Sequence, residues 1–505
     1  MTRALLLAQL EKMAEWDIVI IGGGATGLGS AVDAASRGLK TLLIERADFA
    51  KGTSSRSTKL VHGGVRYLAQ GNIKLVKEAL RERGYLLKNA SHISREQPFI
   101  IPVYSWFDLF FYGIGLKVYD LLAGNLSIGA TKILFAKQTK EALPSVKLPH
   151  LKGGILYHDG QFDDSRLAID LAYTASSNGA IVLNYVTLTG FEKENKKIVG
   201  ILCKDLISGK EYTVKAKSFI NATGVFTDHI LQLDEAERAP IVRPSQGIHL
   251  VVNKSFFSSS NAMMVPKTAD GRVFFAVPWH NEVVLGTTDT AIDTISEEPK
   301  PLNEEIDFII AHFNKYNSVA IERKDVQSVY VGLRPLVKSA GVASTALISR
   351  DHTIIVSPSG LVTITGGKWT TYRKMGEDAV NNALFISKQP KRDCVTVNLK
   401  IGDPEKRRSM IEEIIAEDLN NATLLHENFP YTIAEVIFAI RYEWAETVED
   451  ILARRTRILF LNASVAIKLA GFIANLLAKE LGKDGEWEEK QVSVFCELAQ
   501  QYIIN

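Results

Sequence analysis

The sequence has little cysteine and almost no excess of either charge. Its three cysteines, Cys203, Cys394 and Cys496, are far apart and form no CxxC pair. This pattern argues against zinc, iron–sulfur and disulfide scaffolds, predicts no metal site and fits a reducing cytosol. Lys and Arg number 59 against 57 Asp and Glu, a formal charge of +2. Such a balance gives no support for bulk nucleic-acid binding, although a local basic pocket could still bind an anion.

Long apolar runs are also missing. No run reaches the ~18 residues of a membrane-crossing helix. The apolar cluster at residues 4–8 is too short for a signal peptide and predicts a short amphipathic helix. Hydrophobic residues nevertheless make up 46% and charged residues 23% of the 505 positions. These values are typical of a globular chain, and the length allows two to four domains at ~100–200 residues each.

The strongest positive signal begins at DIVII and ends at TLLIE. These runs predict two strands, and between them GGGATG predicts a glycine turn that opens a helix. In this GxGxxG turn Gly22 permits the tight bend, Gly24 lets a pyrophosphate approach the backbone, and Gly27 lets the helix pack on the strand. Glu45, about 20 residues further on, is placed to bind ribose hydroxyls. The unit predicts a dinucleotide site, with NAD and FAD both open and NADP disfavoured by Glu45.

A second segment, TSSRSTKLVHGGVRYL at residues 53–68, is rich in hydroxyl, basic and glycine residues. Hydroxyl groups here could bond the phosphate or ring of a cofactor, paired glycines could let the backbone approach a flat ring, and an arginine could hold an anion in a bidentate grip. A surface loop with incidental charge is the alternative, but the density of these groups favours a site. The candidates for cofactor contact in this segment are Thr53, Ser55, Ser57 and Lys59.

The sequence resembles the FAD-dependent glycerol-3-phosphate dehydrogenases. The resemblance rests on DIVIIGGGATGLGSAVDAASRG, TSSRSTKLVHGGVRYL, FDDSRL, NATGVFTD, VLGTTDT, VGLRPL, ISRDHT, TGGKWTTYRKM and YTIAEVIFAIRYEWAETVEDILARRTRILFLNA, which span nearly the whole chain in the family's order. HGGVRYL together with GGKWTTYR is the most specific part. The resemblance implies oxidation of sn-glycerol 3-phosphate to dihydroxyacetone phosphate, with the hydride passing to FAD and the electrons to a respiratory quinone.

The resemblance also implies a substrate site that holds a dianionic phosphate with several fixed cations. The residues that would line it are Arg66, Tyr67, Arg334, Arg350 and Lys368. We expect Arg66, Arg334 and Lys368 to bind the phosphate or the developing ketone oxygen.

Removal of the hydroxyl proton needs a base with a pKa near neutral. His62 and His249 are the candidates for this base, and a plain core histidine is an equally good interpretation of His249.

Further flavin contacts follow from the resemblance. Val186 should flank the adenine through its backbone, and Gly224 should bring the chain past the pyrophosphate or adenosine. The run Gly366, Gly367, Lys368, Trp369 and Thr370 precedes a predicted helix, whose N-terminus would face the pyrimidine edge of the flavin. A plain strand–turn–helix junction is the alternative for this run.

We therefore expect an α/β (α+β) fold, with a Rossmann-like FAD-binding domain, an inserted mixed-sheet substrate domain and a C-terminal all-helical domain. The sheet domain is indicated by dense short β runs at residues 240–290 and 325–365, and the helical domain by apolar residues at helical spacing beyond residue 388. The expected boundaries are 1–100, 151–235 and 346–387 for the FAD-binding domain, 101–150 for a substrate or cap segment with a possible membrane contact, 236–345 for the substrate sheet and 388–505 for the helical domain.

Two segments are candidates for contact with a membrane surface. The aromatic stretch at residues 104–124 could dip into the interface through Trp106, Phe107, Phe110, Phe111, Tyr112 and Tyr119, or it could pack as a core helix. The cluster Arg454, Arg455 and Arg457 could bind anionic lipid, or it could interact with a helix C-terminus or surface acids. Asp163 and Asp164 precede a helical run, so helix capping is favoured over a catalytic carboxylate pair.

These considerations favour a peripheral enzyme on the cytoplasmic face of the membrane, with glycerol 3-phosphate and a quinone as partners and a homodimer left open. A glycerol-3-phosphate oxidase, which would pass electrons to O₂ and form peroxide, is the nearest alternative, and the chain has no long mid-chain insertion that would favour it. Another amine- or hydroxy-acid-oxidising flavoenzyme is opposed by HGGVRYL and GGKWTTYR. A non-catalytic flavin-binding sensor would not need His62, Arg66, Arg334 and Lys368 together.

Overall fold

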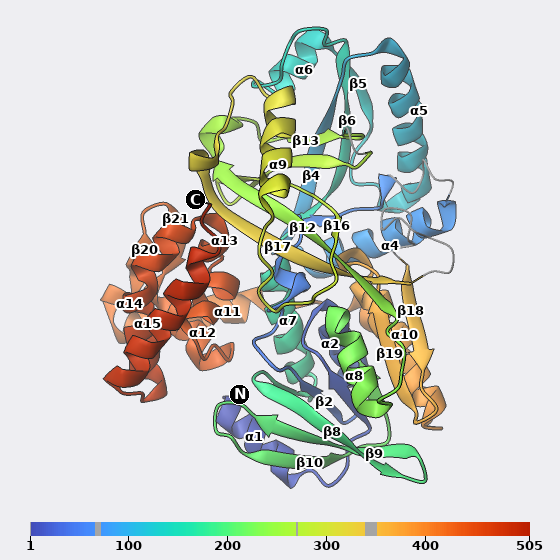
Figure 1. Cartoon of the computed structure of the whole chain (residues 1–505), viewed down its shortest axis with the longest axis vertical. Coiled ribbons are helices and arrows are strands. Elements are labelled where there is room, and N and C mark those ends of the chain that lie inside the picture. Colours follow the sequence, from blue (N-terminus) through green and yellow to red (C-terminus); the bar gives the residue numbers. More distant parts are fainter. Residues whose placement is uncertain (1, 66–71, 269–270, 339–350, 505) are drawn as a thin grey trace.

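The computed structural model describes residues 2–65, 72–268, 271–338 and 351–504. Figure 1 shows three regions in this chain: a sheet flanked by helices near the N-terminus, a larger sheet above it, and a group of C-terminal helices beside them. Arg66, Tyr67 and Arg350, three residues predicted for the substrate site, lie outside the described residues.

The lower sheet is the dinucleotide-binding unit that the glycine turn predicts. Its six strands have the order β18-β19-β11-β1-β2-β7. The bounds are β1 Ile18–Ile21, β2 Thr41–Ile44, β7 Ile181–Leu183, β11 Phe219–Asn221, β18 His352–Val356 and β19 Leu361–Gly366. All neighbours pair in parallel except β18 and β19. The predicted Rossmann-like fold is thus confirmed, and strands from both halves of the chain build it.

Three helices cover this sheet, α2 (Ala25–Ser36), α7 (Asp164–Ser177) and α10 (Tyr372–Ile386). Helix α2 packs against both of the others. A Cβ added to Gly376 would lie 2.6 Å from the carbonyl carbon of Gly29, so α10 and α2 approach each other more closely than larger residues allow. This contact fixes the end of β19, which leads into α10, against the glycine turn at the start of α2.

A smaller antiparallel sheet of β8 (Val186–Glu194), β9 (Lys197–Asp205) and β10 (Glu211–Lys215) lies at the lower end of the molecule, with α8 (Thr227–Asp234) following β11. The predicted N-terminal helix is present as α1 (Arg3–Lys12). Its Leu6 and Leu10 are buried, and Arg3 pairs with Asp205 at 2.5 Å. The N-terminal helix therefore packs on the protein itself.

The upper sheet is mixed, as expected for the substrate domain, because β13 pairs in parallel with β4 while its other neighbours are antiparallel. Its order is β16-β12-β15-β14-β13-β4-β6-β3, with β17 beside β12 and β5 beside β6. The strand bounds are β3 Leu60–Val61, β4 Ser94–Val103, β5 Lys132–Phe135, β6 Gly153–Phe162, β12 Val242–Asn253, β13 Ala262–Val265, β14 Phe274–Trp279, β15 Glu282–Gly286, β16 Thr290–Ala291 and β17 Val326–Val337. The helices around it are α4 Ile73–Asn89, α5 Trp106–Ala123, α6 Ala136–Ala142 and α9 Asn303–Tyr316.

Two of these strands differ from the expected domain boundaries. We assigned most of β4 and all of β6 to the FAD-binding domain, yet they pair with each other and, through β13, with the upper sheet. Pairing between residues 94–103 and 153–162 spans a long sequence separation, so no local pattern reveals it.

The C-terminal region is helical, as predicted, except for one short hairpin. Its helices are α11 Pro404–Glu417, α12 Ile433–Tyr442, α13 Ile458–Leu461, α14 Ala463–Leu481 and α15 Gly485–Gln500, with a π-helical turn at Asp450–Arg455. The hairpin joins β20 (Leu424–His426) to β21 (Phe429–Thr432). A shared apolar cluster extends from these helices to Trp279 and Tyr330 of the upper sheet, so this region packs directly on the substrate domain.

The arginine cluster at the end of the π-helical turn is buried, so the predicted contact with anionic lipid is wrong. The alternative is confirmed in part, because Arg455 donates to the carbonyl of Glu443 at the end of α12, although the acids that the cluster meets are buried rather than on the surface. Arg454 and Arg455 each pair with Asp48 at 2.5 Å, and Arg457 pairs with Asp163 at 2.5 Å. Asp163 also accepts a hydrogen bond from the Arg166 N–H at 3.0 Å and so caps α7, as predicted. The three arginines therefore join the C-terminal region to the FAD-binding domain and do not face lipid.

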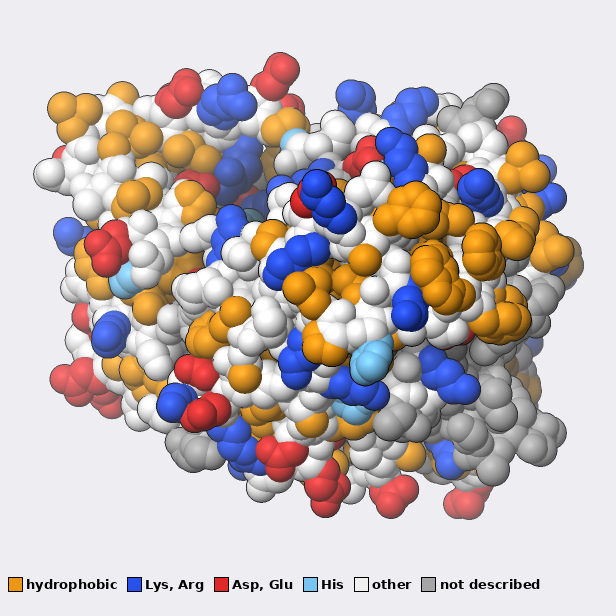
Figure 2. All heavy atoms as spheres, turned by 90° about the horizontal axis from the view of Figure 1, so that it is seen from above, with side chains coloured by type: hydrophobic (Ala, Val, Ile, Leu, Met, Phe, Trp, Pro, Cys, Tyr) orange, Lys and Arg blue, Asp and Glu red, His pale blue; other side chains and the backbone are white. Residues whose placement is uncertain are grey.

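The aromatic stretch forms α5, which is buried on one face and exposed on the other. Leu109, Leu116 and Tyr119 point inward, so the predicted interfacial role of Tyr119 is wrong. The outward apolar side chains are Trp106, Phe107, Phe110, Phe111, Ile114, Val118 and Leu121, whose exposed fractions run from 42% to 80%. Figure 2 shows apolar side chains gathered on the side of the molecule that carries α5, with Lys and Arg among them.

Across the four described stretches, no helix is long and apolar enough to cross a bilayer.

Candidate active site

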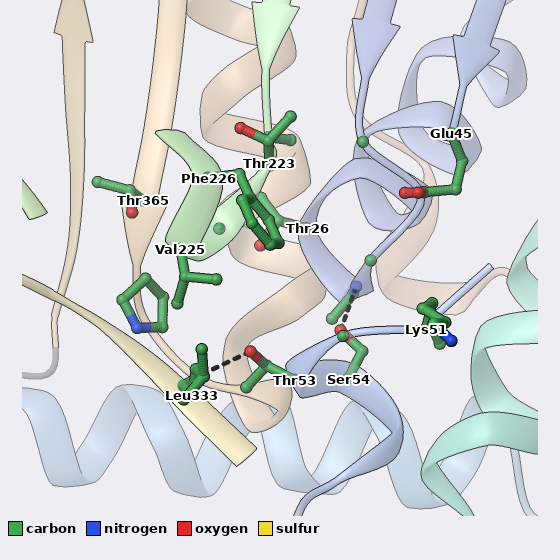
Figure 3. Close-up of a pocket in the computed structure, with 18 of the residues that line it drawn as sticks. Thr26, Glu45, Lys51, Thr53, Ser54, Thr223, Val225, Phe226, Leu333 and Thr365 are labelled. Atoms are coloured by element: carbon green, nitrogen blue, oxygen red, sulfur yellow. Dashed lines mark hydrogen bonds between the residues drawn. The ribbon is translucent and has the colours of Figure 1, made fainter. Parts of the chain in front are cut away.

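A cavity of about 280 Å³ lies at the carboxyl ends of β1, β2 and β11, where parallel α/β sheets bind their ligands. The residues on its wall that the sequence predicts for the cofactor are Gly22, Gly24, Glu45, Thr53, Val186, Gly224, Gly366, Gly367, Lys368 and Trp369. In Figure 3, Glu45 and Lys51 lie at one end of this space, and Val225, Leu333 and Thr365 lie towards the other.

The glycine turn at the start of α2 has no room for side chains. Gly22 has φ +109°, and a Cβ there would lie 2.7 Å from the Ala222 carbonyl oxygen. A Cβ on Gly27 would lie 1.8 Å from the Gly22 carbonyl oxygen. The backbone itself therefore forms the cavity wall, and the N-terminus of α2 presents its dipole and N–H groups there, an arrangement that suits a phosphate anion.

Glu45 ends β2 beside this turn. Its carboxylate accepts hydrogen bonds from the Gly23 N–H at 2.6 Å and from the Ala47 N–H at 2.8 Å. Burial raises the pKa of Glu45. The two backbone bonds fix the orientation of the carboxylate at the cavity wall, where its remaining lone pairs can accept from vicinal hydroxyls of a ribose.

The opposite end of the cavity is formed by the turn after β19. Gly366 and Gly367 have φ +81° and +69°, and a Cβ on Gly367 would collide with the Met375 sulfur. The indole of Trp369 donates to the Ser54 carbonyl at 2.8 Å, and the Thr53 hydroxyl donates to the Leu333 carbonyl at 2.5 Å (Figure 3). The segment at 53–54 is thus tied to both β17 and the 366–369 turn.

A second cavity, of about 300 Å³, adjoins the first. Both are lined by Thr53, Arg56, Pro335, Gly366, Gly367, Lys368 and Trp369, so these residues form the boundary between them. The cationic and imidazole groups on the wall of the second cavity are Arg56, His62, His249, Arg272, Arg334 and Lys368. Such a cavity, next to the one formed by the dinucleotide-binding unit, is suited to a small anionic substrate.

Arg334 supplies a fixed positive charge to this wall. Its Nη1 donates to the Gln246 carbonyl and to Asp289, both at 3.2 Å, and its Nη2 donates to the Thr288 carbonyl at 2.8 Å and the Thr287 hydroxyl at 3.1 Å. The terminal N–H groups are therefore engaged by the protein. In this arrangement Arg334 can attract an anion by charge, but it does not offer a bidentate grip.

His249, on β12, is 3% exposed and forms part of the same wall. Its Nε2 lies 2.8 Å from the Thr58 hydroxyl, and its ring stacks on Tyr330 with centroids 4.9 Å apart. Its Nδ1 has no hydrogen-bond partner among the residues that the structure describes. Burial, with the charges of Arg334 and Lys59, lowers the pKa of His249 and so favours the neutral form of the imidazole.

Family models match most of the chain. Residues 17–373 match the model described as FAD dependent oxidoreductase, and residues 406–491 match the C-terminal domain of alpha-glycerophosphate oxidase.

Relatives cover the chain almost end to end. The mitochondrial glycerol-3-phosphate dehydrogenase of Homo sapiens is 38% identical over 97% of this chain and 74% of its own length. Glycerol-3-phosphate dehydrogenase SDP6 of Arabidopsis thaliana is 36% identical over 96% of this chain and 86% of its own.

The chain belongs to the FAD-dependent glycerol-3-phosphate dehydrogenase family. The structure of a glycerol-3-phosphate dehydrogenase from Bacillus halodurans, complexed with FAD, has a TM-score of 0.80 and 28% identity, and the two chains cover 99% and 98% of each other. An FAD-bound L-α-glycerophosphate oxidase from Mycoplasma pneumoniae, at 18% identity and a TM-score of 0.57, shares the fold.

FAD is the cofactor of this glycerol-3-phosphate dehydrogenase family member, and the first cavity fits it. The glycines of the turn at Gly22–Gly27 leave room for a pyrophosphate, and Glu45 is placed to bind a ribose. The 366–369 turn can hold the flavin ring at the boundary with the second cavity. These assignments remain predictions for the individual residues.

The structure places most of the predicted residues on the walls of the two cavities, but three of those that it describes, Gly27, Ser55 and Lys59, line neither cavity. Ser57 and Thr370 line the second cavity, and Gly27 packs behind the glycine turn. The Ser55 hydroxyl donates to the Gly52 carbonyl at 3.3 Å.

Lys59 does not lie where the predicted cofactor contact would place it, because it lines neither cavity. Its ammonium lies 2.8 Å from Asp164 and 5.0 to 5.3 Å from the ring centroids of Trp279, Tyr330 and Phe460. Burial lowers the pKa of Lys59. Lys59 is thus a buried ion-pair residue behind the second cavity rather than a ligand of the flavin.

Thr58, Arg272 and Asp159 also line the second cavity, and the sequence did not indicate them as site residues. Thr58 belongs to the hydroxyl-rich segment, so composition could have indicated it. Arg272 and Asp159 stand in no recognisable motif, and only the pairing of distant strands brings them to the wall.

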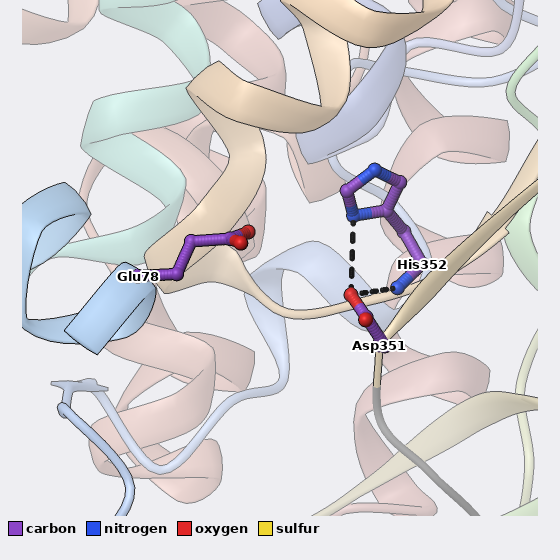
Figure 4. Close-up of side chains that lie close together, drawn as sticks. All are labelled: Glu78, Asp351 and His352. Atoms are coloured by element: carbon purple, nitrogen blue, oxygen red, sulfur yellow. Dashed lines mark hydrogen bonds and ion pairs between the residues drawn. The ribbon is translucent and has the colours of Figure 1, made fainter. Parts of the chain in front are cut away.

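A further group of potential metal ligands, Glu78, Asp351 and His352, has its ligand atoms within 4.8 Å of one another (Figure 4). The two ring nitrogens of His352 face carboxylates, Asp378 at 3.0 Å and Asp351 at 3.6 Å. Burial lowers the pKa of His352, but the hydrogen bond and charge of Asp378 outweigh burial and raise it. Because both ring nitrogens already face carboxylates, we interpret this group as a set of ion pairs.

Proposed function

We propose that this protein oxidises sn-glycerol 3-phosphate to dihydroxyacetone phosphate in the second cavity. The observation that carries the proposal is the shared wall at 366–369, which places a chamber rich in cationic groups directly beside the FAD cavity. A phosphate dianion in a partly dry chamber needs fixed positive charge, and Arg272, Arg334 and Lys368 supply it.

When bound, FAD accepts the hydride that leaves C2 of the substrate. The protein must then remove the proton of the C2 hydroxyl as the carbonyl forms. We propose His249 for this step, because its imidazole lies on the wall of the second cavity and its Nδ1 lacks a partner among the described residues. Lys368, at the boundary of the two cavities, is placed to stabilise negative charge on the oxygen during the transfer.

The electron acceptor and the location are further parts of the proposal. We propose a respiratory quinone as acceptor and peripheral attachment to the cytoplasmic face of the membrane, with the outer face of α5 as the attachment surface. Seven exposed apolar side chains on one helix form a surface of the kind that lies in a lipid interface.

The test is an anaerobic titration of the FAD-loaded enzyme with glycerol 3-phosphate, followed at the visible absorbance maximum of the flavin. We expect bleaching that persists when air is admitted and is reversed by a soluble quinone analogue. Rapid recovery in air with formation of peroxide would instead support the oxidase, which the C-terminal family model keeps as the alternative. A yellow protein that does not bleach would contradict the proposed substrate.

His249→Asn is the matched variant for the base. It keeps a polar side chain of similar reach and removes the basic nitrogen. We expect FAD to stay bound and the rate of bleaching to fall by about 10²–10⁴-fold. Bleaching at the wild-type rate would exclude His249 as the base and leave His62 as the candidate.

A further inference from the structure

Asp159, on β6, is a buried carboxylate on the wall of the substrate cavity that the proposed chemistry does not use. It is 3% exposed, and its three hydrogen-bonding neighbours among the described residues are all donors. Oδ1 accepts from Arg83 at 2.9 Å and from the Gly63 N–H at 3.2 Å, and Oδ2 accepts from the Tyr119 hydroxyl at 3.0 Å. Three donors from three separate elements therefore converge on one side chain.

The Gly63 N–H belongs to a turn that continues from β3. His62, Gly64 and Val65 line the substrate cavity, so this turn is one of its walls. On the other side of the turn, a Cβ on Gly63 would collide with the Tyr119 hydroxyl and with Leu80. The peptide of Gly63 is thus held from behind by packing and by a single carboxylate.

Helices α4 and α5 hold that carboxylate in turn. Arg83 and Tyr119 are each 1% exposed, and the Arg83 guanidinium lies 5.9 Å from the centre of the Tyr119 ring. A buried carboxylate needs such partners, because its charge is costly without them. The inner face of α5, whose outer face is apolar and exposed, is therefore bonded through Asp159 to the wall of the cavity.

We propose that Asp159 is a positioning residue, which fixes the Gly63 peptide and with it the orientation of the 62–65 turn towards the substrate. Tyr119 and Arg83 act through Asp159. The inference rests on the proposed function, since it concerns where glycerol 3-phosphate is held for hydride transfer. A displacement of the turn of about 1 Å would lower the rate of transfer by up to about 10²-fold.

Asp159→Asn is the direct test, because the amide keeps the volume but points an NH₂ group at a neighbouring donor. Anaerobic stopped-flow reduction of the flavin by glycerol 3-phosphate separates the limiting rate of reduction from the apparent dissociation constant. We expect the limiting rate to fall 10- to 100-fold, a smaller rise of the dissociation constant, and FAD content and reduction by dithionite as in the wild type.

Tyr119→Phe keeps the inference testable if the asparagine variant does not fold. It removes one donor and keeps the ring, and we expect the limiting rate to fall three- to tenfold. Tyr104→Phe is the matched control, because the Tyr104 hydroxyl donates to the Lys147 carbonyl at 3.0 Å and Tyr104 does not line the cavity. Its rate should equal that of the wild type.

The two proposals fail in different ways. If the wild type is not reduced by glycerol 3-phosphate, the proposed function is wrong. If the wild type is reduced and Tyr119→Phe reacts within twofold of it, the positioning role is wrong. A fall in the rate of Tyr119→Phe that is matched by loss of FAD would also overturn it, because that result assigns the cluster to stability alone.

Discussion

Two segments with the composition of membrane contacts lie in opposite environments in this protein. The arginines at 454, 455 and 457 are buried and paired with acids of the FAD-binding domain. The aromatic helix α5 is buried on one face only, and its other face carries seven exposed apolar side chains. Composition describes both segments equally well, so what separates them is whether the rest of the chain supplies a partner.

For the arginines the partners come from a great distance in sequence. Asp48 lies about 400 residues before Arg455, and it follows the β2 strand of the dinucleotide unit. A buried cation is stable only when paired, so this contact also fixes how the C-terminal region sits on the FAD-binding domain. For α5 the inward stripe of Leu109, Leu116 and Tyr119 completes its packing, and no described element covers the outer stripe.

Asp48→Asn should give the largest effect. Burial acts to raise the pKa of Asp48, but the charges of Arg455 and Arg454 outweigh it and lower the pKa. Removing the charge of Asp48 takes a buried acidic partner away from both Arg454 and Arg455. This loss should lower the free energy of unfolding by about 3–5 kcal/mol. Chemical denaturation at pH 7 measures this loss. Because the folded-state pKa is lowered, the stabilisation is present above the unfolded pKa and should disappear as the pH falls through the folded pKa.

Asp307→Asn is the matched control for this variant. Asp307 pairs with Arg323 at 2.8 Å, but its side chain is 64% exposed. Such a surface pair contributes roughly 0–1 kcal/mol. If Asp48→Asn were no more destabilising than Asp307→Asn, the arginine cluster would not be the link between the two regions.

The double variant Phe107→Ser, Phe111→Ser should give the next largest effect. The rings are 75% and 55% exposed and stack on each other with centroids 6.0 Å apart. Their loss should weaken binding to neutral phosphatidylcholine vesicles by about 2–3 kcal/mol, since each buried phenylalanine is worth roughly 1.5–3 kcal/mol and the burial is partial. Co-sedimentation measures the partition, and reduction of the flavin by substrate should be unchanged.

Phe385→Ser is the control for α5. Phe385 is 80% exposed near the end of α10, away from the apolar face of α5. Its loss should not alter vesicle binding. Equal losses from the two helices would show that any exposed phenylalanine contributes and that α5 is no special surface.

The sequence predicts the dinucleotide unit well because that unit is local. Gly22, Gly27 and Glu45 lie within about 25 residues, and the roles of a tight turn, a helix contact and an acid at a strand end depend on that spacing. The mixed sheet and the helical C-terminal region were also predicted from periodicity.

The substrate cavity was harder to predict, because distant strands build it. Arg334 is expected to bind the phosphate or the developing ketone oxygen, and the sequence does not indicate that its terminal N–H groups bind Gln246, Thr287, Thr288 and Asp289. Lys59 stands in a motif of polar residues, yet it is buried beside Asp164. The two residues share one cause: a sequence shows that a cation is present but not which acceptors fold around it.

Lys117→Gln should give the smallest effect and the sharpest contrast with the buried arginines. Lys117 is an exposed cation on α5, three residues beyond Ile114 and thus on the apolar face. Near an anionic bilayer one lysine contributes about 1 kcal/mol, so the variant should bind anionic vesicles roughly fivefold more weakly. Binding to neutral vesicles should not change, and neither should the free energy of unfolding, because no buried acid in the described part of the chain pairs with Lys117. A loss of stability like that of Asp48→Asn would mean that Lys117 has a partner within the protein, and the distinction between paired and unpaired surfaces would then fail at α5.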